Sequence, residues 1–246
     1  MHLLELVPRD LTQLCADATQ FLNQFPLLKG INIPDVKRLD VRSVMAADAL
    51  LADGVFVVPH IRAMDHSIDD HILLITPLVK KGLTAILIVA GDPIKDQDVV
   101  SHHVSSVQLI SALKQRFPTL QVYGALDPYR HSFDEELLYC QEKQDIGVDG
   151  FFTQPFFDVP LAALYLEKLR QTTVFLGASP VTSEKSKQYW ERVNKVQFSD
   201  AFETTLDYHV TLTRDLIAVA ERFNQHVYMM PIKVDVNSYL EKVYLT

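Results

Sequence analysis

The sequence predicts an α/β fold in a single domain over residues 1–246: a closed (β/α)8 barrel, also called a TIM barrel. Eight short apolar runs rich in β-forming residues alternate with segments of helical periodicity along the whole chain. No Gly/Ser-rich or Pro-rich linker interrupts this alternation, which is typical of parallel strands joined by helical crossovers. A chain of 246 residues is also long enough to bury such a barrel as one domain.

The predicted strands follow one another from the N-terminus to the C-terminus. They are Leu3–Val7, Gly30–Ile33, Val55–Pro59, Ala85–Ala90, Gln121–Ala125, Gly150–Thr153, Val174–Gly177 and Val227–Met230. Eight such units favour a closed barrel. A doubly wound open sheet is the alternative, but neither its usual GxGxxG turn after the first strand nor a GxxxxGK[ST] motif is present.

Capping residues mark the starts of several predicted helices. Asp10 stands before the first periodic apolar segment, and Ser132 with Glu135 forms a capping box before another helix. Asp200, with a glutamate three residues later, predicts the start of a long helix that ends at about Phe223.

Composition argues against several classes of partner and location. The 31 acidic and 23 basic residues give a formal charge of -8, which repels phosphate backbones, so we expect no nucleic-acid partner. Cys15 and Cys140 form no CxxC or Cys/His motif, which argues against a disulfide scaffold and fits a reducing cytoplasm. The apolar runs fall short of the roughly 18 residues that span a bilayer, and the first residues lack a basic leader, so we expect cytoplasmic localisation without membrane anchoring.

Polar residues stand at the predicted strand ends, where a barrel places its active site. They are Glu5, Asn32, Asp35, His60, Arg62, Asp65, Asp92, Tyr123, Asp127, Gln154, Ser179 and Lys233. The residues alone therefore predict an acid-rich barrel mouth that also holds one amide and one imidazole.

The His- and Asp-rich run between His60 and His71 raises the question of a metal site. His66 and Asp70 would share one helical face, but no reliable ligand set follows from this spacing. Ser67 and the acidic residues suit the start of a helix instead. We therefore predict no metal site.

Four strand ends resemble those of the methylenetetrahydrofolate reductase family. The motifs, in order, are Glu5-Leu-Val-Pro-Arg9, Pro59-His60-Ile-Arg-Ala-Met-Asp65, Gly91-Asp92-Pro93 and Thr153-Gln154-Pro-Phe-Phe-Asp158. Each is short, but their joint order is fairly specific, and the resemblance covers most of the chain up to about Pro180. It implies a flavoenzyme of one-carbon metabolism and methionine biosynthesis. Reduced FAD would pass a hydride from NAD(P)H to 5,10-methylenetetrahydrofolate and give 5-methyltetrahydrofolate.

The resemblance assigns catalytic and substrate-binding roles to three residues. Glu5 matches the general acid that protonates the departing folate nitrogen, and its apolar neighbours would raise its pKa. Asp92 matches the aspartate that favours a cationic iminium and also touches flavin and folate. Gln154 matches the amide that reads the pterin edge. The alternatives are a strand-end cap or salt bridge for Glu5, a helix N-cap for Asp92 and a satisfied core amide for Gln154.

Flavin contacts are implied at seven positions, but the expected cations are incomplete. The positions are His60, Ala90, Gly91, Asp92, Tyr123, Asp127 and Lys143, the last with its helix partners Tyr139 and Glu136. His60 has a structural alternative of equal weight. Ala90 and Glu142 stand where the family usually has arginines, Asp127 replaces a histidine and Pro34 a threonine. We therefore expect FAD to be weakly bound.

These departures leave two other readings open besides the reductase. One is a flavin-poor relative that binds tetrahydrofolate or transfers a methyl group. The other is a nonenzymatic subunit that acts with a partner protein. Each of these hypotheses retains a small-molecule folate as the partner. Each is also compatible with a homo-oligomer or with binding to a partner protein.

Overall fold

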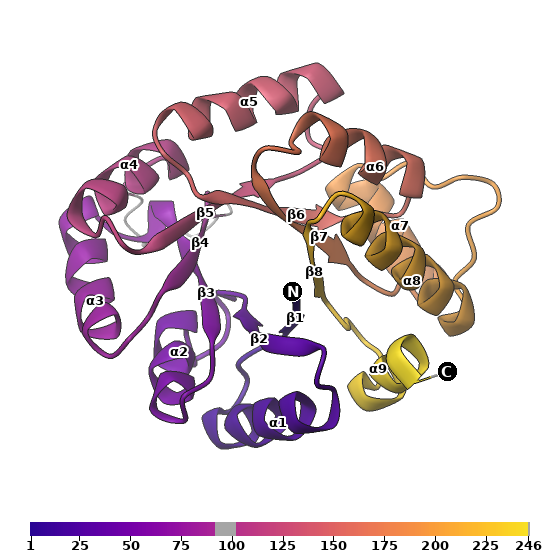
Figure 1. Ribbon diagram of the computed structural model, residues 1–246, viewed down its shortest axis with the longest axis horizontal. Coiled ribbons are helices and arrows are strands. Elements are labelled where there is room, and N and C mark those ends of the chain that lie inside the picture. The colour runs from indigo at the N-terminus through magenta and orange to yellow at the C-terminus, as the bar shows by residue number, and fades with distance from the viewer. Residues whose placement is uncertain (92–101, 246) are drawn as a thin grey trace.

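Eight parallel strands close into a barrel at the centre of the molecule (Figure 1). The computed structural model describes residues 1–91 and 102–245. The strands are β1 (His2–Glu5), β2 (Leu28–Ile33), β3 (Val57–Arg62), β4 (Ala85–Val89), β5 (Gln121–Leu126), β6 (Gly150–Pro155), β7 (Thr173–Ala178) and β8 (His226–Met229). Each strand pairs with the next, and β8 pairs with β1. The predicted closed barrel is confirmed, and the open sheet is excluded.

Helices surround the barrel between successive strands (Figure 1). They are α1 (Leu11–Gln24), α2 (Ser43–Ala52), a 3-10 turn η1 (Ala63–Asp65), α3 (Ile68–Lys80), α4 (Ser106–Arg116), α5 (Phe133–Asp145), α6 (Val159–Lys168), α7 (Glu184–Asn194), α8 (Leu206–Arg222) and α9 (Val236–Leu245). The last helix returns to the first, since Gln24 Nε2 donates to Glu241 Oε1 at 3.3 Å. No helix in the described ranges is long and apolar enough to cross a membrane.

Two of the predicted helix starts are confirmed in atomic detail. The Asp10 carboxylate accepts a hydrogen bond from Gln13 N at 2.8 Å and caps α1. Ser132 and Glu135 bond reciprocally to each other's backbone N–H, which is the predicted capping box of α5. These starts were predictable because caps depend on residues only three positions apart.

The predicted long helix starting near Asp200 is wrong at its N-terminal end. Helix α8 begins at Leu206, where the Thr205 side chain accepts a hydrogen bond from Tyr208 N. The preceding segment is not helical, because Phe202 packs into an aromatic cluster with Phe157 and Phe198. Tertiary packing has therefore overridden a local capping signal.

Inward-facing strand residues fill the interior of the barrel with mostly apolar side chains and leave its C-terminal end polar. The buried interior layer comprises Leu3, Val58, Ala85, Leu87, Tyr123, Phe152, Phe175, Tyr228 and Met230. Because side chains alternate along a strand with a period of two, the next inward positions on β1 and β3 are Glu5 and His60. A second, larger apolar layer lies between the strands and the helices.

Candidate active site

Glu5 ends β1 and reaches the barrel interior with only 10% of its side chain exposed. Asn32 Nδ2, on the neighbouring β2, donates a hydrogen bond to Glu5 Oε2 at 3.1 Å. Burial raises the pKa of Glu5 to about 8, although the Asn32 hydrogen bond acts in the opposite direction. At neutral pH the carboxyl group therefore carries a proton that it can donate.

His60 lies beside Glu5 on the next strand along, β3. Its Nε2 is 3.9 Å from Glu5 Oε2, and it is buried without a hydrogen-bond partner among the described residues. Burial lowers the pKa of His60 to about 4, so the imidazole is neutral at physiological pH. The two side chains are thus uncharged neighbours. For the predicted alternative of a strand-end salt bridge, the described residues offer Glu5 no cationic partner.

Gln154 lies at the C-terminal end of β6, where a bulge interrupts the pairing with β7. It is half-buried, and its side chain makes no hydrogen bond to the described part of the chain. An unused amide at a barrel rim offers one donor and one acceptor edge to a ligand. Next to it, Thr153 O accepts a hydrogen bond from the Tyr228 hydroxyl, which ties β6 to β8.

The loop after β4 begins with two of the predicted cofactor-binding residues. Ala90 is exposed, and Gly91 has a φ of +94°. A Cβ at Gly91 would lie 2.9 Å from Met64 Cγ and 3.1 Å from an Arg62 guanidinium nitrogen, so only glycine fits this turn. Asp92 falls outside the described residues, and its catalytic, folate-binding and flavin-binding roles stay predictions.

The structure does not bring Tyr123 to the barrel mouth. Its ring lies in the interior layer, edge-on to Phe152 and Phe175. Its hydroxyl donates to Gln121 Oε1 at 3.2 Å, toward the start of its own strand. The predicted flavin contact of Tyr123 therefore gains no support from its geometry.

Lys143 and its predicted partners form a closed cluster behind the end of β5. Lys143 is 2% exposed, its Nζ donates to Ala125 O at 2.5 Å, and the ammonium lies 4.0 Å from the centre of the Tyr139 ring. Burial lowers the pKa of Lys143 to about 8. The family resemblance implied a flavin contact for this lysine, but its ammonium already bonds within the protein.

Glu136 and Asp127 complete this cluster. Glu136 is fully buried and accepts two hydrogen bonds from Arg130 Nη2, both at 2.9 Å, and one from Asp127 N at 2.9 Å. The Asp127 carboxylate accepts from Tyr129 N at 3.0 Å, and burial raises its pKa. The charges here balance one another inside the protein, so little cationic character remains to hold a diphosphate.

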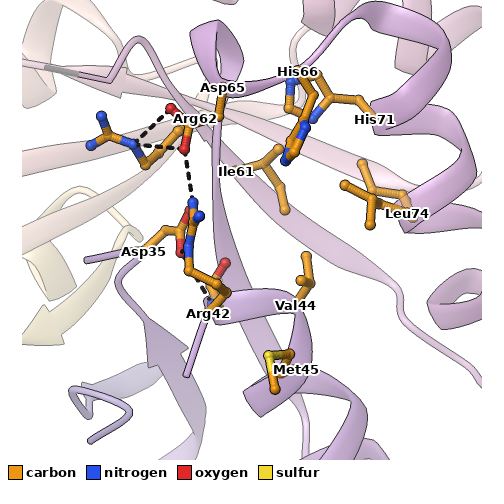
Figure 2. Close-up of a pocket in the computed structure, with 12 residues that line it drawn as sticks. Asp35, Arg42, Val44, Met45, Ile61, Arg62, Asp65, His66, His71 and Leu74 are labelled. Atoms are coloured by element: carbon orange, nitrogen blue, oxygen red, sulfur yellow. Dashed lines mark hydrogen bonds and ion pairs between the residues drawn. The ribbon is translucent and has the colours of Figure 1, made fainter. Parts of the chain in front are cut away.

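Asp35 and Asp65, predicted at strand ends, join an ion-pair network at the rim instead of facing Glu5 (Figure 2). Arg42 lies 2.5 Å from Asp35 Oδ2 and 2.8 Å from Asp65 Oδ2, and Arg62 lies 3.2 Å from Asp65 Oδ2. Beside this network, a pocket of about 250 Å³ opens between α2 and α3. Its other walls are mostly apolar, with Ile61, Val44, Met45, Leu74, His66 and His71 arranged around the space (Figure 2).

The histidines and aspartates between residues 60 and 71 have separate local roles. His71 Nε2 donates to Ala63 O at 3.0 Å. Ser67 caps α3, where its hydroxyl bonds to Asp70. Over residues 1–91 and 102–245, no three His, Cys, Asp or Glu side chains are grouped so as to hold a metal ion.

Asn32 is the site residue to which the sequence assigned no role. The sequence placed it at a strand end, and the only further signal was its position on the strand that follows Glu5. The contact between the two side chains depends on the register of β1 and β2, which pairs Glu5 with Asn32.

Comparisons with known proteins agree with this barrel. A protein from Clostridium thermocellum, described as uncharacterized and as binding two copies of 5-methyl-5,6,7,8-tetrahydrofolic acid, has a similar structure with a TM-score of 0.70 at 12% identity. That alignment covers 99% of this chain and 93% of the other. An oxaloacetate acetylhydrolase gives a TM-score of 0.60 at 12% identity and covers 97% of this chain and 78% of the other.

A 2,3-dimethylmalate lyase of the PEP mutase/isocitrate lyase superfamily gives a TM-score of 0.59 at 11% identity and covers 95% and 75% of the two chains. At such identities the similarity shows the fold alone.

No curated protein matches the sequence significantly. The sequence profile described as methylenetetrahydrofolate reductase matches residues 34–220, well over half of the chain. The chain therefore belongs to the methylenetetrahydrofolate reductase family.

Proposed function

We propose that the barrel mouth binds a reduced one-carbon folate and that Glu5 is the acid that protonates it. The single observation that carries this proposal is the buried Glu5 carboxyl group, whose pKa of about 8 keeps it protonated at neutral pH. Family membership supports a folate as the ligand. The Clostridium thermocellum protein of the same fold, which binds 5-methyltetrahydrofolate, supports it as well.

The chemistry of a one-carbon bridge explains the need for such an acid. The methylene carbon of 5,10-methylenetetrahydrofolate is bonded to two nitrogens, and one of these bonds must break before the carbon can accept a hydride. When Glu5 transfers its proton to the departing nitrogen, that nitrogen takes the bonding electron pair and leaves as a neutral amine. The remaining iminium is cationic, and the new Glu5 carboxylate stabilises it electrostatically.

Gln154 is proposed to orient the pterin. Its half-buried amide is unengaged within the described ranges, so both its donor and its acceptor are available to the ring edge. The product of the complete reaction would be 5-methyltetrahydrofolate.

The described residues fit a flavin at its ring end but not at its diphosphate arm. His60 Nε2 and Asn32 Oδ1 are buried polar atoms that make no hydrogen bond to the described residues, so both can contact a bound ring. In contrast, Lys143 is already bonded to Ala125 O, and Ala90 and Glu142 supply no cation. We therefore propose that FAD, which would supply hydride from NAD(P)H, is held weakly at most.

The second candidate function is folate binding or methyl transfer without a resident flavin, alone or with a partner protein. The cluster of Lys143, Glu136 and Arg130 favours it, because Arg130 is paired with Glu136 and Lys143 Nζ is bonded to Ala125 O. An absorbance spectrum of gently purified protein, before and after FAD is added, separates the two candidates. A saturable change in the flavin absorbance bands during FAD addition supports the reductase, and no change at any accessible FAD concentration supports the flavin-free candidate.

Folate binding itself is tested by calorimetric titration with 5-methyltetrahydrofolate. We expect saturable binding that Gln154→Ala weakens, while the exposed Glu203→Gln change leaves it unaltered. No heat of binding at millimolar folate, in protein that is folded by circular dichroism, would contradict the proposal.

A further inference from the structure

Among the described residues, the Asn32 side chain makes a single hydrogen bond, and that bond goes to Glu5. The two residues are Cα partners in the pairing of β1 with β2, so they lie at the same level of the barrel. Asn32 is fully buried. Its Nδ2 donates to Glu5 Oε2 at 3.1 Å, whereas its Oδ1 is buried and accepts no hydrogen bond from the described residues.

This arrangement is unfavourable for a residue that serves only to stabilise the barrel. Buried polar groups are normally satisfied, and an unpaired buried acceptor destabilises the folded state. An aliphatic side chain of similar size would avoid that cost. Within the described part of the chain, the one hydrogen bond of the Asn32 side chain is with the Glu5 carboxyl, so its effect falls on that group.

The other groups around Glu5 do not duplicate this contact. The Tyr228 hydroxyl, from β8, is directed to Thr153 O. His60, from β3, stays 3.9 Å away, which is beyond hydrogen-bond distance. Within the described ranges, Asn32 is therefore the donor that orients the carboxyl group.

An N–H donor at one carboxyl oxygen decides where the acid proton lies. In a neutral carboxyl group one oxygen carries the proton and the other acts as acceptor. Since Oε2 accepts from Asn32 Nδ2, the proton is placed on Oε1. After the proton leaves, the same N–H bond stabilises the carboxylate, because hydrogen bonds to charged groups are stronger than those between neutral groups.

We propose that Asn32 is a positioning residue that holds Oε2 of Glu5, so that Oε1 carries the proton toward the ligand, and that stabilises the carboxylate left behind. This inference rests on the proposed function for the identity of the proton acceptor. The coupling between the two side chains does not depend on any ligand.

The first test measures this coupling in the free protein by a double-mutant cycle. The variants are Asn32→Leu, Glu5→Gln and the two combined, each unfolded in urea between pH 6.5 and pH 9.5. Below the pKa of Glu5 the carboxyl is neutral in the wild type and in Asn32→Leu. At higher pH the wild-type carboxylate keeps its donor, whereas in Asn32→Leu it does not.

The expected sign follows from the two pKa values. The pKa of folded Glu5 is about 8, above its ordinary value of 4.5, so stability falls as pH rises between these values. Without Asn32 the folded pKa rises further, and the fall continues above pH 8. Relative to wild type, the unfolding constant of Asn32→Leu should increase roughly tenfold from pH 6.5 to pH 9.5, about one unit of pKa.

In the Glu5→Gln background this pH-dependent increase should vanish. Thr213→Val is the matched control, because Thr213 is also buried and loses one side-chain hydrogen bond, to Tyr239, far from the mouth. It should destabilise the protein without that rise. An equal rise in the Glu5→Gln background, or no rise in Asn32→Leu, would overturn the inference.

The second test uses the ligand reaction and separates failure of the inference from failure of the proposed function. In Asn32→Leu, the alkaline limb of the pH profile for folate turnover should move upward by about one unit, with a larger loss in kcat than in affinity for 5-methyltetrahydrofolate. An unshifted profile would count against Asn32 alone. If the stability cycle shows coupling but neither protein binds folate, the positioning of Glu5 stands and the folate proposal fails.

Discussion

Arginines at positions 90 and 142 should strengthen the weak FAD binding that we propose. The perturbation is the double substitution Ala90→Arg and Glu142→Arg, at the positions where the family resemblance expects arginines. Both positions are exposed, so the new side chains require no repacking of the core. The formal charge changes by +3 in total, since Ala90→Arg adds one unit and Glu142→Arg adds two.

The expected gain in FAD affinity depends on whether the cation already present, Lys143, is available to bind a phosphate. Lys143 Nζ is committed to Ala125 O at 2.5 Å and to the Tyr139 ring at 4.0 Å. Releasing it to a phosphate would sacrifice both contacts. Each new arginine offers a charge-assisted contact, but because an exposed pair contributes only about 1 kcal/mol, we expect up to about fivefold in affinity per arginine.

Quenching of flavin fluorescence during titration of the protein into FAD measures this change. The double variant should bind FAD roughly five- to thirtyfold more tightly than wild type, and raised salt should weaken the gain. Leu138→Arg, on the exposed face of the same helix as Glu142, controls for a general effect of positive charge. Tight, stoichiometric FAD in the wild type, or no gain over the control, would refute the missing-anchor reasoning.

Three further variants test the site and the fold. Glu5→Gln should retain flavin reduction by NAD(P)H but lose most methylenetetrahydrofolate reduction. Rapid-mixing measurements of the two half-reactions test this prediction. A near wild-type rate of folate reduction would eliminate Glu5 as the acid. The same variant should also lessen the loss of stability between pH 5 and pH 9, because the pKa of Glu5 is raised from 4.5 to about 8, a difference of 3.5 units or about 5 kcal/mol at most. Gln154→Ala should raise the folate concentration needed for turnover and spare nicotinamide oxidation by an artificial acceptor, whereas equal losses in both assays would indicate structural damage. Gly30→Ala should destabilise the barrel by about 1–3 kcal/mol or more in urea unfolding, because the added Cβ would lie 2.4 Å from Phe56 Cδ1; a stability equal to wild type would show that this contact relaxes freely.

Strand and helix order could be read from the sequence because the signals are local. Each buried parallel strand is a short apolar run, and each cap depends on side chains three residues apart. The ends were less certain: β3 runs to Arg62, three residues past its predicted end at Pro59. Helix α8 starts later than its capping signal suggested, because Phe202 packs against aromatic residues distant in sequence.

The candidate site was only partly predictable, for the same physical reason. Glu5, His60 and Gln154 were identified from strand-end motifs, and the barrel places Glu5 and His60 side by side. Tyr123 was assigned to the flavin, yet its hydroxyl is directed to Gln121. Whether a strand residue faces the mouth or the layer below depends on barrel stagger, which no local pattern encodes.

The sequence by itself determined the family, the closed barrel and the position of Glu5 at the end of the first strand. Only the tertiary structure decided that Asn32 is the partner of Glu5 and that Lys143 is bonded inside the protein. Strand pairing and burial bring together residues far apart in sequence, and burial sets the pKa of each group through the solvent it excludes. The protonated state of Glu5, on which the proposed chemistry depends, is therefore a property of the folded barrel.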